Sequence, residues 1–480
     1  MLDQSKKIWF LILSFSFILL NGFFIIQEKF EFLLLPVLLL IIYLALFKMD
    51  VLIKVIVFLT PLSISLSEIN EGAAIDMALP TEPILFGLML IFILKLFKDG
   101  SFDSKIIRHP VTIAILINLV WIALTSIPSI HPLISFKFLL GRLWFLIGYY
   151  FIISQLFKSR KNISQFFWLY IGGFSLVIAY TIIMHSANGF DQKSANWIMG
   201  PFFNDHTSYG AALAFLMPFL VFKVFDKDIL GTKKLLIFLL LGYFTLALVL
   251  SFTRAAWVSV VGSLIVFLVL KFKIKWWVIT VGFIFSAVLL IGLWTQLSTS
   301  MASNKQDSSS NLKEHVSSIS NVTSDASNLE RLNRWNAAYE MFKKRPLLGW
   351  GPGVYSFEYA PFQKSKDKTI ISTNTGDGGN AHSEYLGPLA ESGIIGTLSY
   401  LLIILTIIYT AVKVYKKPAL SPKMRAMVLV SFLGLVSYFI HGILNNFLDT
   451  DKISALFWGM TAVIVIIDLY HSQEDKEIKT

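Results

Sequence analysis

Apolar runs, each about as long as a membrane-crossing helix, recur along the whole of this 480-residue chain. A helix crosses the hydrocarbon core with about 20 residues. Strands of a membrane barrel would instead be about 10 residues long with alternating polarity, which the sequence lacks. Only 15% of the residues are charged, against about 25% in soluble domains. The sequence therefore predicts an all-α polytopic membrane protein.

Fourteen candidate spans can be counted, and we expect 12–14 transmembrane helices. The first follows Lys6 and Lys7 as a signal peptide would, but it is long and leads directly into the second, so we expect it to be retained. The third and fourth spans are short and could be re-entrant. The candidates are residues 8–26, 30–47, 51–66, 82–97, 110–127, 138–157, 163–184, 207–225, 233–251, 255–272, 276–294, 385–411, 426–444 and 453–470.

The distribution of Lys and Arg predicts the orientation of these spans. With the N-terminus in the cytoplasm, the inner short loops are rich in cations, as in 158–161, 223–234 and 413–425. The outer short loops hold few cations, and 67–80 is acidic. The net charge of +11 is then loop charge, and we expect no nucleic-acid partner. The prediction is a multi-pass protein of the bacterial inner membrane with both termini cytoplasmic.

One long polar segment interrupts the apolar runs and defines the expected domains. It makes a large outer-face loop at 295–384, after an N-terminal membrane region of about eleven helices at 1–294. Residues 385–480 would supply about three more helices and a short cytoplasmic tail. Residues 296–326 are too polar to bury a core, and we expect them to be mobile.

The second half of the loop predicts a short helix. Ser327-Asn-Leu-Glu330 matches a capping box, and Pro346 would end the helix shortly after Lys344. Its apolar residues recur at spacings of three and four and would lay one stripe on the membrane surface or the span ends. They are Leu332, Trp335, Tyr339 and Phe342.

Three arginines on the outer face are candidate ligands for phosphate. Arg254 lies at a span boundary, where a cation is unusual on the outer side, although it could simply snorkel to the headgroups. Arg331 and Arg334 lie one turn apart on the loop helix and could merely be solvated. Arginine offers a charged, bidentate donor fork that matches phosphate. We therefore expect an anionic, lipid-borne substrate.

His382 lies where the loop meets the next span and is the candidate general base. A histidine titrates near neutrality, although a lone histidine is more often structural. His206 and His441 compete for the role, and Asp449 and Asp451 are outer-face carboxylates that could bind an acceptor or orient a histidine. The chain has no cysteine, no nucleotide-binding glycine loop and no His-Glu-x-x-His motif, which excludes thiolate metal sites and argues against nucleotide hydrolysis and zinc proteolysis.

Four elements of the sequence occur in a characteristic order. They are Gly200-Pro-Phe-Phe-Asn204; Ser251-x-Thr-Arg254-Ala-Ala-Trp257; Arg331-x-x-Arg334-Trp followed by Pro346-Leu-Leu-Gly-Trp-Gly-Pro-Gly353; and Ala381-His382-Ser-Glu384-Tyr followed by Glu391-Ser-Gly-Ile-Ile-Gly396. Over about residues 195–410 the chain resembles the O-antigen ligase / O-antigen polymerase family. It departs from the family pattern at Ala255, where glycine is common, and at Ser383, where asparagine is common.

The resemblance implies a GT-C-like, inverting membrane glycosyltransferase that needs no metal and no cofactor. Its donor would be a glycan on undecaprenyl diphosphate, and its acceptor a hydroxyl of a lipid or glycan at the outer face of the membrane. Arg254 and one or both of Arg331 and Arg334 would hold the diphosphate, and His382 would act as the base. Further substrate-binding candidates are Arg142, Asn204, His206, Glu384 and Asp449.

Several activities share these motifs. A ligase-type transfer to lipopolysaccharide core is the preferred interpretation, with a polysaccharide polymerase and a protein O-glycan ligase as alternatives. A lipid-linked oligosaccharide flippase is the alternative from another class. Against it, a transporter would place charges within the spans of two similar halves, whereas the polar groups here gather at one face.

Overall fold

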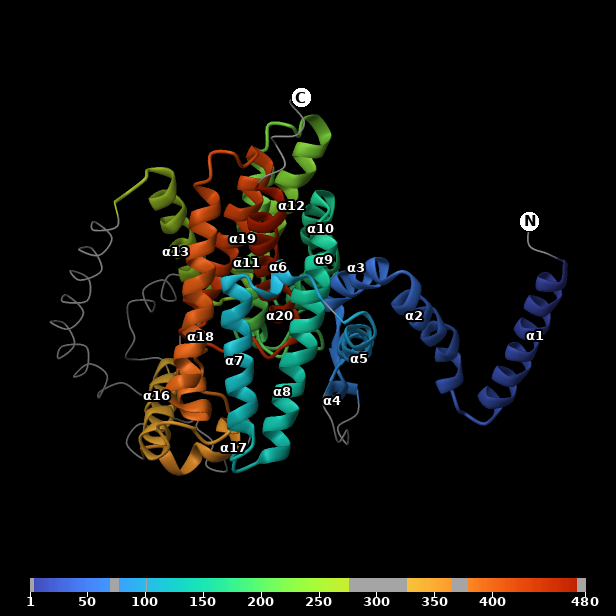
Figure 1. The fold of residues 1–480 in the computed structure, drawn as a ribbon, viewed down its shortest axis with the longest axis horizontal. Helices are drawn as coiled ribbons and strands as arrows, with labels where there is room; N and C mark the ends of the chain where they lie inside the picture. The colour runs from blue at the N-terminus through green and yellow to red at the C-terminus, as the bar shows by residue number, and fades with distance from the viewer. Residues whose placement is uncertain (1–3, 70–76, 101, 276–325, 365–378, 473–480) are drawn as a thin grey trace. The chain divides into compact units, whose positions relative to one another are not determined.

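The computed structural model describes residues 4–69, 77–100, 102–275, 326–364 and 379–472 (Figure 1). It is almost entirely helical and confirms the all-α class. The predicted span 276–294 and nearly all of the polar segment 296–326 lie outside the described residues.

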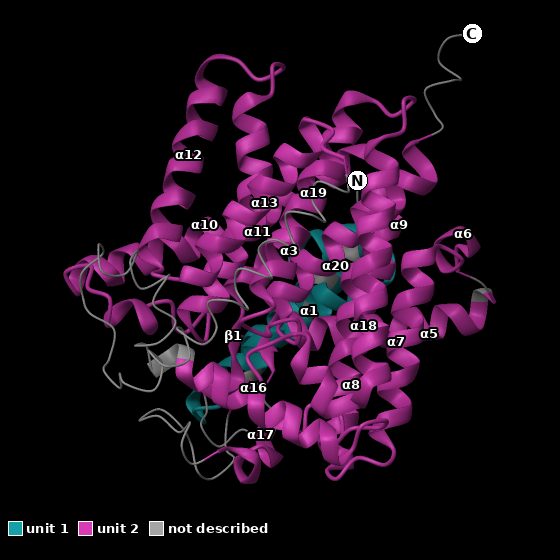
Figure 2. Ribbon diagram, turned by 90° about the vertical axis from the view of Figure 1, so that its left-hand side faces the viewer, with its two compact units in different colours: residues 1–55 teal, residues 56–480 magenta. Residues whose placement is uncertain are grey.

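The chain divides into two compact units, Met1–Val55 and Ile56–Thr480 (Figure 2). The first unit holds α1 (Gln4–Ile26), the 3-10 turn η1 (Glu31–Leu34), α2 (Leu35–Phe47) and the start of α3 (Met49–Leu59). Large apolar side chains cover the surface of this unit, as lipid-facing helices require. The three-part division at 294 and 384 stays a prediction.

The second unit holds the longest helices. Eight of the described helices are long and apolar enough to cross a membrane, and Ser14–Ile26, Phe32–Phe47 and Pro110–Ser126 are shorter apolar helices. The chain is thus a polytopic membrane protein, while the count of fourteen spans is not confirmed. The elements are α5 (Thr81–Asp99), α6 (Ser104–Ile107), α7 (Pro110–Ser126), α8 (Pro132–Leu146), the π-helix η3 (Ile147–Ile152), α9 (Ile153–Phe157), α10 (Arg160–Ala187), η4 (Ser194–Asn196), α11 (His206–Phe225), α12 (Gly231–Leu250), α13 (Arg254–Lys271), α16 (Ala326–Lys344), α17 (Tyr355–Glu358), η5 (Ala360–Phe362), α18 (Leu386–Tyr415), α19 (Pro422–His441), α20 (Asp451–Ile466) and the π-helix η7 (Ile467–His471).

The third predicted span, 51–66, is not one continuous helix. The 11-residue helix α3 stops at Leu59, and the 3-10 turn η2 (Thr60–Leu62) contains Pro61, whose ring removes a backbone donor. The chain then forms β1 (Ile64–Ser65) and α4 (Leu66–Ile69), and β1 pairs antiparallel with β2 (Ala78–Leu79). An 11-residue helix rises only about 16 Å, roughly half of the hydrocarbon core.

Three helices form the centre of the second unit. The apolar windows of α19 and α20 are 83% buried, whereas that of α12 is 17% buried and faces outward. Small residues allow the central helices to approach closely, because a Cβ on Gly434 of α19 would lie 2.7 Å from the Met460 sulfur of α20 and from the Phe215 carbonyl oxygen of α11. The loops before α11 and α20 are therefore anchored to tightly packed helices.

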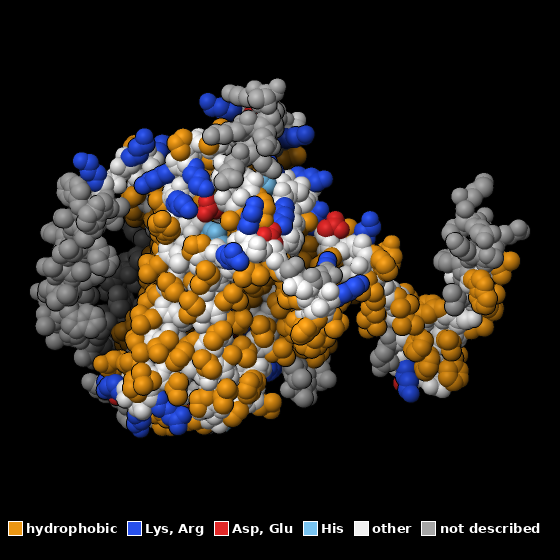
Figure 3. All heavy atoms as spheres, in the orientation of Figure 1, with side chains coloured by type: hydrophobic (Ala, Val, Ile, Leu, Met, Phe, Trp, Pro, Cys, Tyr) orange, Lys and Arg blue, Asp and Glu red, His pale blue; other side chains and the backbone are white. Residues whose placement is uncertain are grey.

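Charged side chains gather away from the apolar surface. Figure 3 shows Lys and Arg at the upper end of the second unit, near the C-terminus, above a broad field of apolar side chains. A second group of cations lies at the lower left. Such a division suits a bilayer around the apolar field, and the cytoplasmic placement of the two termini stays a prediction.

Candidate functional site

The loop helix α16 buries a different face from the one predicted. It starts at Ala326, so Ser327 lies inside the helix and not at its N-cap, whereas the predicted end near Lys344 is correct. Tyr339 of the predicted apolar stripe is 51% exposed. The buried face carries Glu330, Asn333, Arg334, Ala337, Ala338 and Met341. Its polar members bond to partners within the protein, so this face of the helix can be buried despite its composition.

Arg334 is held almost entirely by the protein. Its Nε donates to Glu330 Oε1 at 2.7 Å, and its Nη1 donates to the Asn380 carbonyl oxygen at 3.1 Å. The guanidinium also lies over the Tyr359 ring, 5.0 Å from its centroid. A Cβ on Gly379 would lie 1.8 Å from Nη1, so a residue with no side chain is needed beside it. Arg334 thereby joins α16 to the segment that carries His382.

Arg331 and Arg254 come from distant segments and lie within electrostatic reach of each other. Arg254 is the first residue of α13 and is partly exposed. Arg331 Nε donates to the Leu444 carbonyl oxygen at 3.3 Å. Burial and the charge of Arg254 lower the pKa of Arg331 to about 10, while Asp205 opposes the shift. Both arginines remain charged at neutral pH, so a cationic cluster forms at this end of the protein.

His382 joins this cluster in a strained backbone conformation. Its φ of 48° is left-handed, which is uncommon for a residue with a side chain. Its N–H donates to Asn380 Oδ1 at 3.0 Å, and its carbonyl oxygen accepts from Trp335 Nε1 at 3.3 Å. Burial, followed by the charges of Arg331 and Arg334, lowers its pKa to about 3. The imidazole is therefore neutral at physiological pH.

Glu384, a predicted substrate ligand, is committed to the protein instead. Its Oε1 accepts from the backbone N–H groups of Phe447 and Leu448, each at 2.8 Å, and from the Tyr438 hydroxyl. Burial raises the pKa of this carboxyl, which the Tyr438 bond opposes. The residue ties the start of α18 to the loop before α20, and its contacts favour a structural role.

The glycine-rich motif packs against a break in α18. Gly393 has φ 69° and ψ −169°, so the helix is interrupted at that point. Backbone groups freed by the break bond to the motif, because Ile394 N–H donates to the Pro346 carbonyl oxygen and Trp350 N–H to that of Ala390. A Cβ on Gly393 would lie 2.1 Å from the Leu347 carbonyl oxygen. Both family-like motifs therefore build one backbone junction.

A cavity of about 500 Å³ opens beside the cationic cluster. Asn380 and Asp205 belong to both, because they line the cavity while Asn380 bonds to Arg334 and the charge of Asp205 acts on Arg331 and His382. The structure places Arg142, Asn204 and Asp449 of the predicted substrate ligands on its wall.

The remaining candidates lie around the same cavity. Arg142 Nη1 donates to the Leu448 carbonyl oxygen at 3.4 Å. Asp449 lies on the cavity wall, where the surrounding protein raises the pKa of its carboxyl and the charge of Arg142 opposes the rise. The carbonyl oxygen of His206, the first residue of α11, accepts from the hydroxyl of Thr253, the neighbour of Arg254, at 2.7 Å.

Two residues near the cluster were not singled out from the sequence. Asp205 is the N-cap of α11, accepting from Ser208 N–H at 2.7 Å, and an aspartate just before an apolar run was the available signal. Asn380 had no signal, because its role depends on Arg334, which is 46 residues earlier in the chain.

Together, the apolar helices define a multi-pass α-helical membrane protein, and Arg254 and Arg331 form a cationic cluster at one end of it. Residues 235–401 match the family model described as O-antigen ligase, which supports a relationship to the O-antigen ligase family. The matched segment contains Arg254, Arg331, Arg334 and His382. A protein of Haemophilus influenzae described as uncharacterized is 24% identical over 219 residues, which span 45% of this chain and 53% of that protein. The chain thus spans about half the length of this relative.

Proposed function

We propose that this protein transfers a glycan from an undecaprenyl-diphosphate carrier to an acceptor hydroxyl at the outer face of the bacterial inner membrane. The family match supports an O-antigen ligase or polymerase type of activity. The observation that carries the finer proposal is the meeting of Arg254, Arg331 and His382, from three distant segments, within one electrostatic neighbourhood.

The diphosphate would bind the guanidinium groups of Arg254 and Arg331. Negative charge grows on the leaving oxygen as the glycosidic C–O bond breaks, and fixed cations stabilise that charge. Arg334 is already bonded to Glu330 and Asn380, so its main role is to position Asn380 and His382. The acceptor oxygen attacks the anomeric carbon from the opposite side, which inverts its configuration.

His382 would take the proton of the acceptor hydroxyl. Without donor, Arg331 and Arg334 depress its basicity. A bound diphosphate brings negative charge beside the same arginines and raises the pKa of the imidazole. The base is thus strengthened when the donor is in place, which favours transfer to an acceptor in the donor-loaded protein.

The direct test is transfer by the purified protein in nanodiscs, given undecaprenyl-diphosphate-linked glycan and an acceptor. His382→Ala is expected to slow a single turnover about 10²- to 10⁴-fold. His131→Ala is the matched control, because this histidine bonds to Glu358 outside the cluster. Equal rates for His382→Ala and wild type would overturn the proposal.

The acceptor separates the alternatives within the family. Transfer to lipid A–core marks a ligase, extension of the carrier-linked chain a polymerase, and transfer to Ser or Thr a protein glycan ligase. Movement of intact carrier-linked glycan across the bilayer without transfer would instead indicate a flippase.

A further inference from the structure

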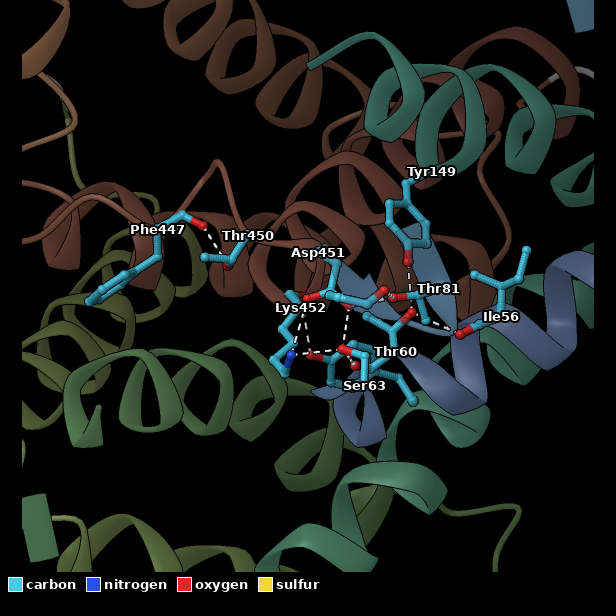
Figure 4. Close-up of polar contacts among 11 residues, drawn as sticks. Ile56, Thr60, Ser63, Thr81, Tyr149, Phe447, Thr450, Asp451 and Lys452 are labelled. Atoms are coloured by element: carbon cyan, nitrogen blue, oxygen red, sulfur yellow. Dashed lines mark hydrogen bonds and ion pairs between the residues drawn. The ribbon is translucent and has the colours of Figure 1, made fainter. Parts of the chain in front are cut away.

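The cavity wall carries a buried ion pair, Asp451 and Lys452, that the proposed reaction does not use. Lys452 Nζ donates to Asp451 Oδ1 at 3.1 Å and to the Ser63 hydroxyl at 2.7 Å. Asp451 Oδ2 accepts from the hydroxyls of Ser63 at 2.5 Å and Thr81 at 2.7 Å. Figure 4 shows these side chains meeting at the start of α20. Both members of the pair line the cavity.

Burying this ion pair lowers the stability of the fold, and a role in binding would explain why it is present. Asp451 is 2% exposed and Lys452 8% exposed. Taking two charges out of water costs several kcal/mol per ion, and apolar replacements of buried pairs are often neutral or stabilising. Ser63 just before β1 and Thr81 at the start of α5 fix the geometry of the pair. Their bonds hold a neutral but strongly polar corner in place.

The rest of the wall is of mixed charge and aromatic. It carries four acidic and three basic side chains, which are Glu82, Asp205, Asp449, Asp451, Lys137, Arg142 and Lys452. Phe138, Phe202, Phe203 and Phe447 add ring surface. A wall of this kind does not select a strong anion. It suits a saccharide, whose hydroxyls both donate and accept and whose C–H faces pack on rings.

A second, independent observation points to a ligand on this wall. Trp144 lines the cavity and is 7% exposed, and among the described residues its Nε1–H has no acceptor. Buried donors normally have partners; this nitrogen is shielded from the cavity as the indole stands, and a rotation of the indole toward the cavity would let a sugar hydroxyl accept its hydrogen.

The cavity wall lies almost wholly outside the segment that matches the family. Gly353 and Asn380 are the cavity residues that fall within 235–401, and the remainder come from 65–208 and 446–452. We infer that Asp451, Lys452 and Trp144 bind a sugar ring of the substrate and set glycan specificity, separately from the cationic cluster. This inference rests on the proposed function for the identity of the substrate.

The test pairs a neutralised ion pair with a matched control. In Asp451→Asn/Lys452→Gln the side chains keep hydrogen-bonding groups but lose their charges. The KM for glycan is expected to rise about tenfold to a hundredfold, the cost of charge-assisted bonds. Measuring KM separately for donor and acceptor tells which of the two supplies the sugar. The control is Lys417→Gln/Asp468→Asn, which removes a pair outside the cavity with a separation of 2.5 Å.

A second pair of variants guards against misfolding. Trp144→Phe keeps a ring and removes the unpartnered donor, and should raise the same KM about three- to tenfold. Trp458→Phe is its control, because Trp458 also has an indole N–H without an acceptor among the described residues but lines a neighbouring cavity of about 40 Å³ and not the large one. Equal KM values in each variant and its control would overturn the inference.

Saccharide binding is measured independently of transfer. Saturation-transfer NMR of the full chain in nanodiscs, with methyl glycosides of hexoses and N-acetylhexosamines, should show binding that Trp144→Phe weakens and Trp458→Phe preserves. If these glycosides bind in this pattern while no glycan is transferred, the proposed function fails and the sugar site stands. Binding that is unaffected by Trp144→Phe and by Asp451→Asn/Lys452→Gln removes the sugar site.

Discussion

The cationic cluster and the cavity wall beside it differ in charge, in origin and in how they are held. The cluster brings together Arg254, Arg331 and His382 from the segment that matches the O-antigen ligase family. The wall is nearly balanced in charge and comes from the flanking parts of the chain. If the proposed function holds, the segment that matches the family binds the diphosphate and the flanking parts of the chain bind the glycan.

The sharpest way to break this comparison is to remove Arg334, which holds the cluster together. Arg334→Gln leaves Glu330 buried without its ion-pair partner, and the free energy of unfolding should fall by about 3–5 kcal/mol. Thermal unfolding followed by intrinsic fluorescence measures the loss. Glu330→Gln/Arg334→Gln should recover most of the stability, since no buried charge is left unpaired. A single variant as stable as wild type would contradict the positioning role.

Arg331 offers a smaller and more specific change. Arg331→Gln removes a cation that we assign to the diphosphate, and kcat should fall about 10²- to 10³-fold with little loss of stability. Arg331→Lys keeps the charge but not the planar fork, and should recover only part of the rate. Single-turnover transfer measures both. Arg345→Gln is the control, because this exposed arginine lies over Trp350, away from the cluster. Equal losses for Arg331→Gln and Arg345→Gln would place the diphosphate elsewhere.

The pH dependence of stability gives the most gradual effect, because it is spread over several pH units. The unfolded chain protonates His382 near its ordinary pKa of 6.5, whereas the folded protein does so only near 3. Between these values the unfolded state binds the extra proton, so stability falls as pH decreases from about 6.5 to about 3. The slope should be at most about 1.4 kcal/mol per pH unit.

His382→Gln should flatten this dependence, and unfolding curves of both proteins at several pH values measure the difference. Adding inorganic diphosphate should narrow the pH range over which stability changes. Its negative charge offsets Arg331 and Arg334 and so brings the pKa of folded His382 closer to the unfolded value. The same pH dependence in both proteins would mean that His382 is not held neutral by its surroundings.

Much of the fold follows from the sequence because a bilayer imposes strict lengths on apolar helices. The long spans at α10, α11, α18, α19 and α20 were predicted close to their observed bounds. The prediction of one continuous span at 51–66 was wrong. The sequence is largely apolar up to Ile64, but the helix ends at Leu59 before the turn that contains Pro61 and the short strand pair that follows. The local sequence did not show that β1 would pair with β2 in place of a continued helix.

The candidate site was predictable where side-chain chemistry is conspicuous. Arginines on an outer face and a histidine at a loop end stand out in an apolar sequence. The buried face of α16 did not stand out, since it carries Glu330, Asn333 and Arg334 and reads as polar until their partners are known. The ion pair of Asp451 and Lys452 was equally hidden, because Ser63 and Thr81, which fix it, are 389 and 370 positions away in the chain.

The interruption at Gly393 has a mechanical consequence. The break leaves some backbone N–H and C=O groups of α18 without a partner inside the helix. These groups form hydrogen bonds with the backbone of the segment from Pro346 to Gly351. Backbone hydrogen bonds, which do not depend on any side chain, therefore join this loop to the membrane helix. If α18 tilts in a thicker or thinner bilayer, the loop must move with it. Bilayer thickness would then change the positions of the groups that we propose to react.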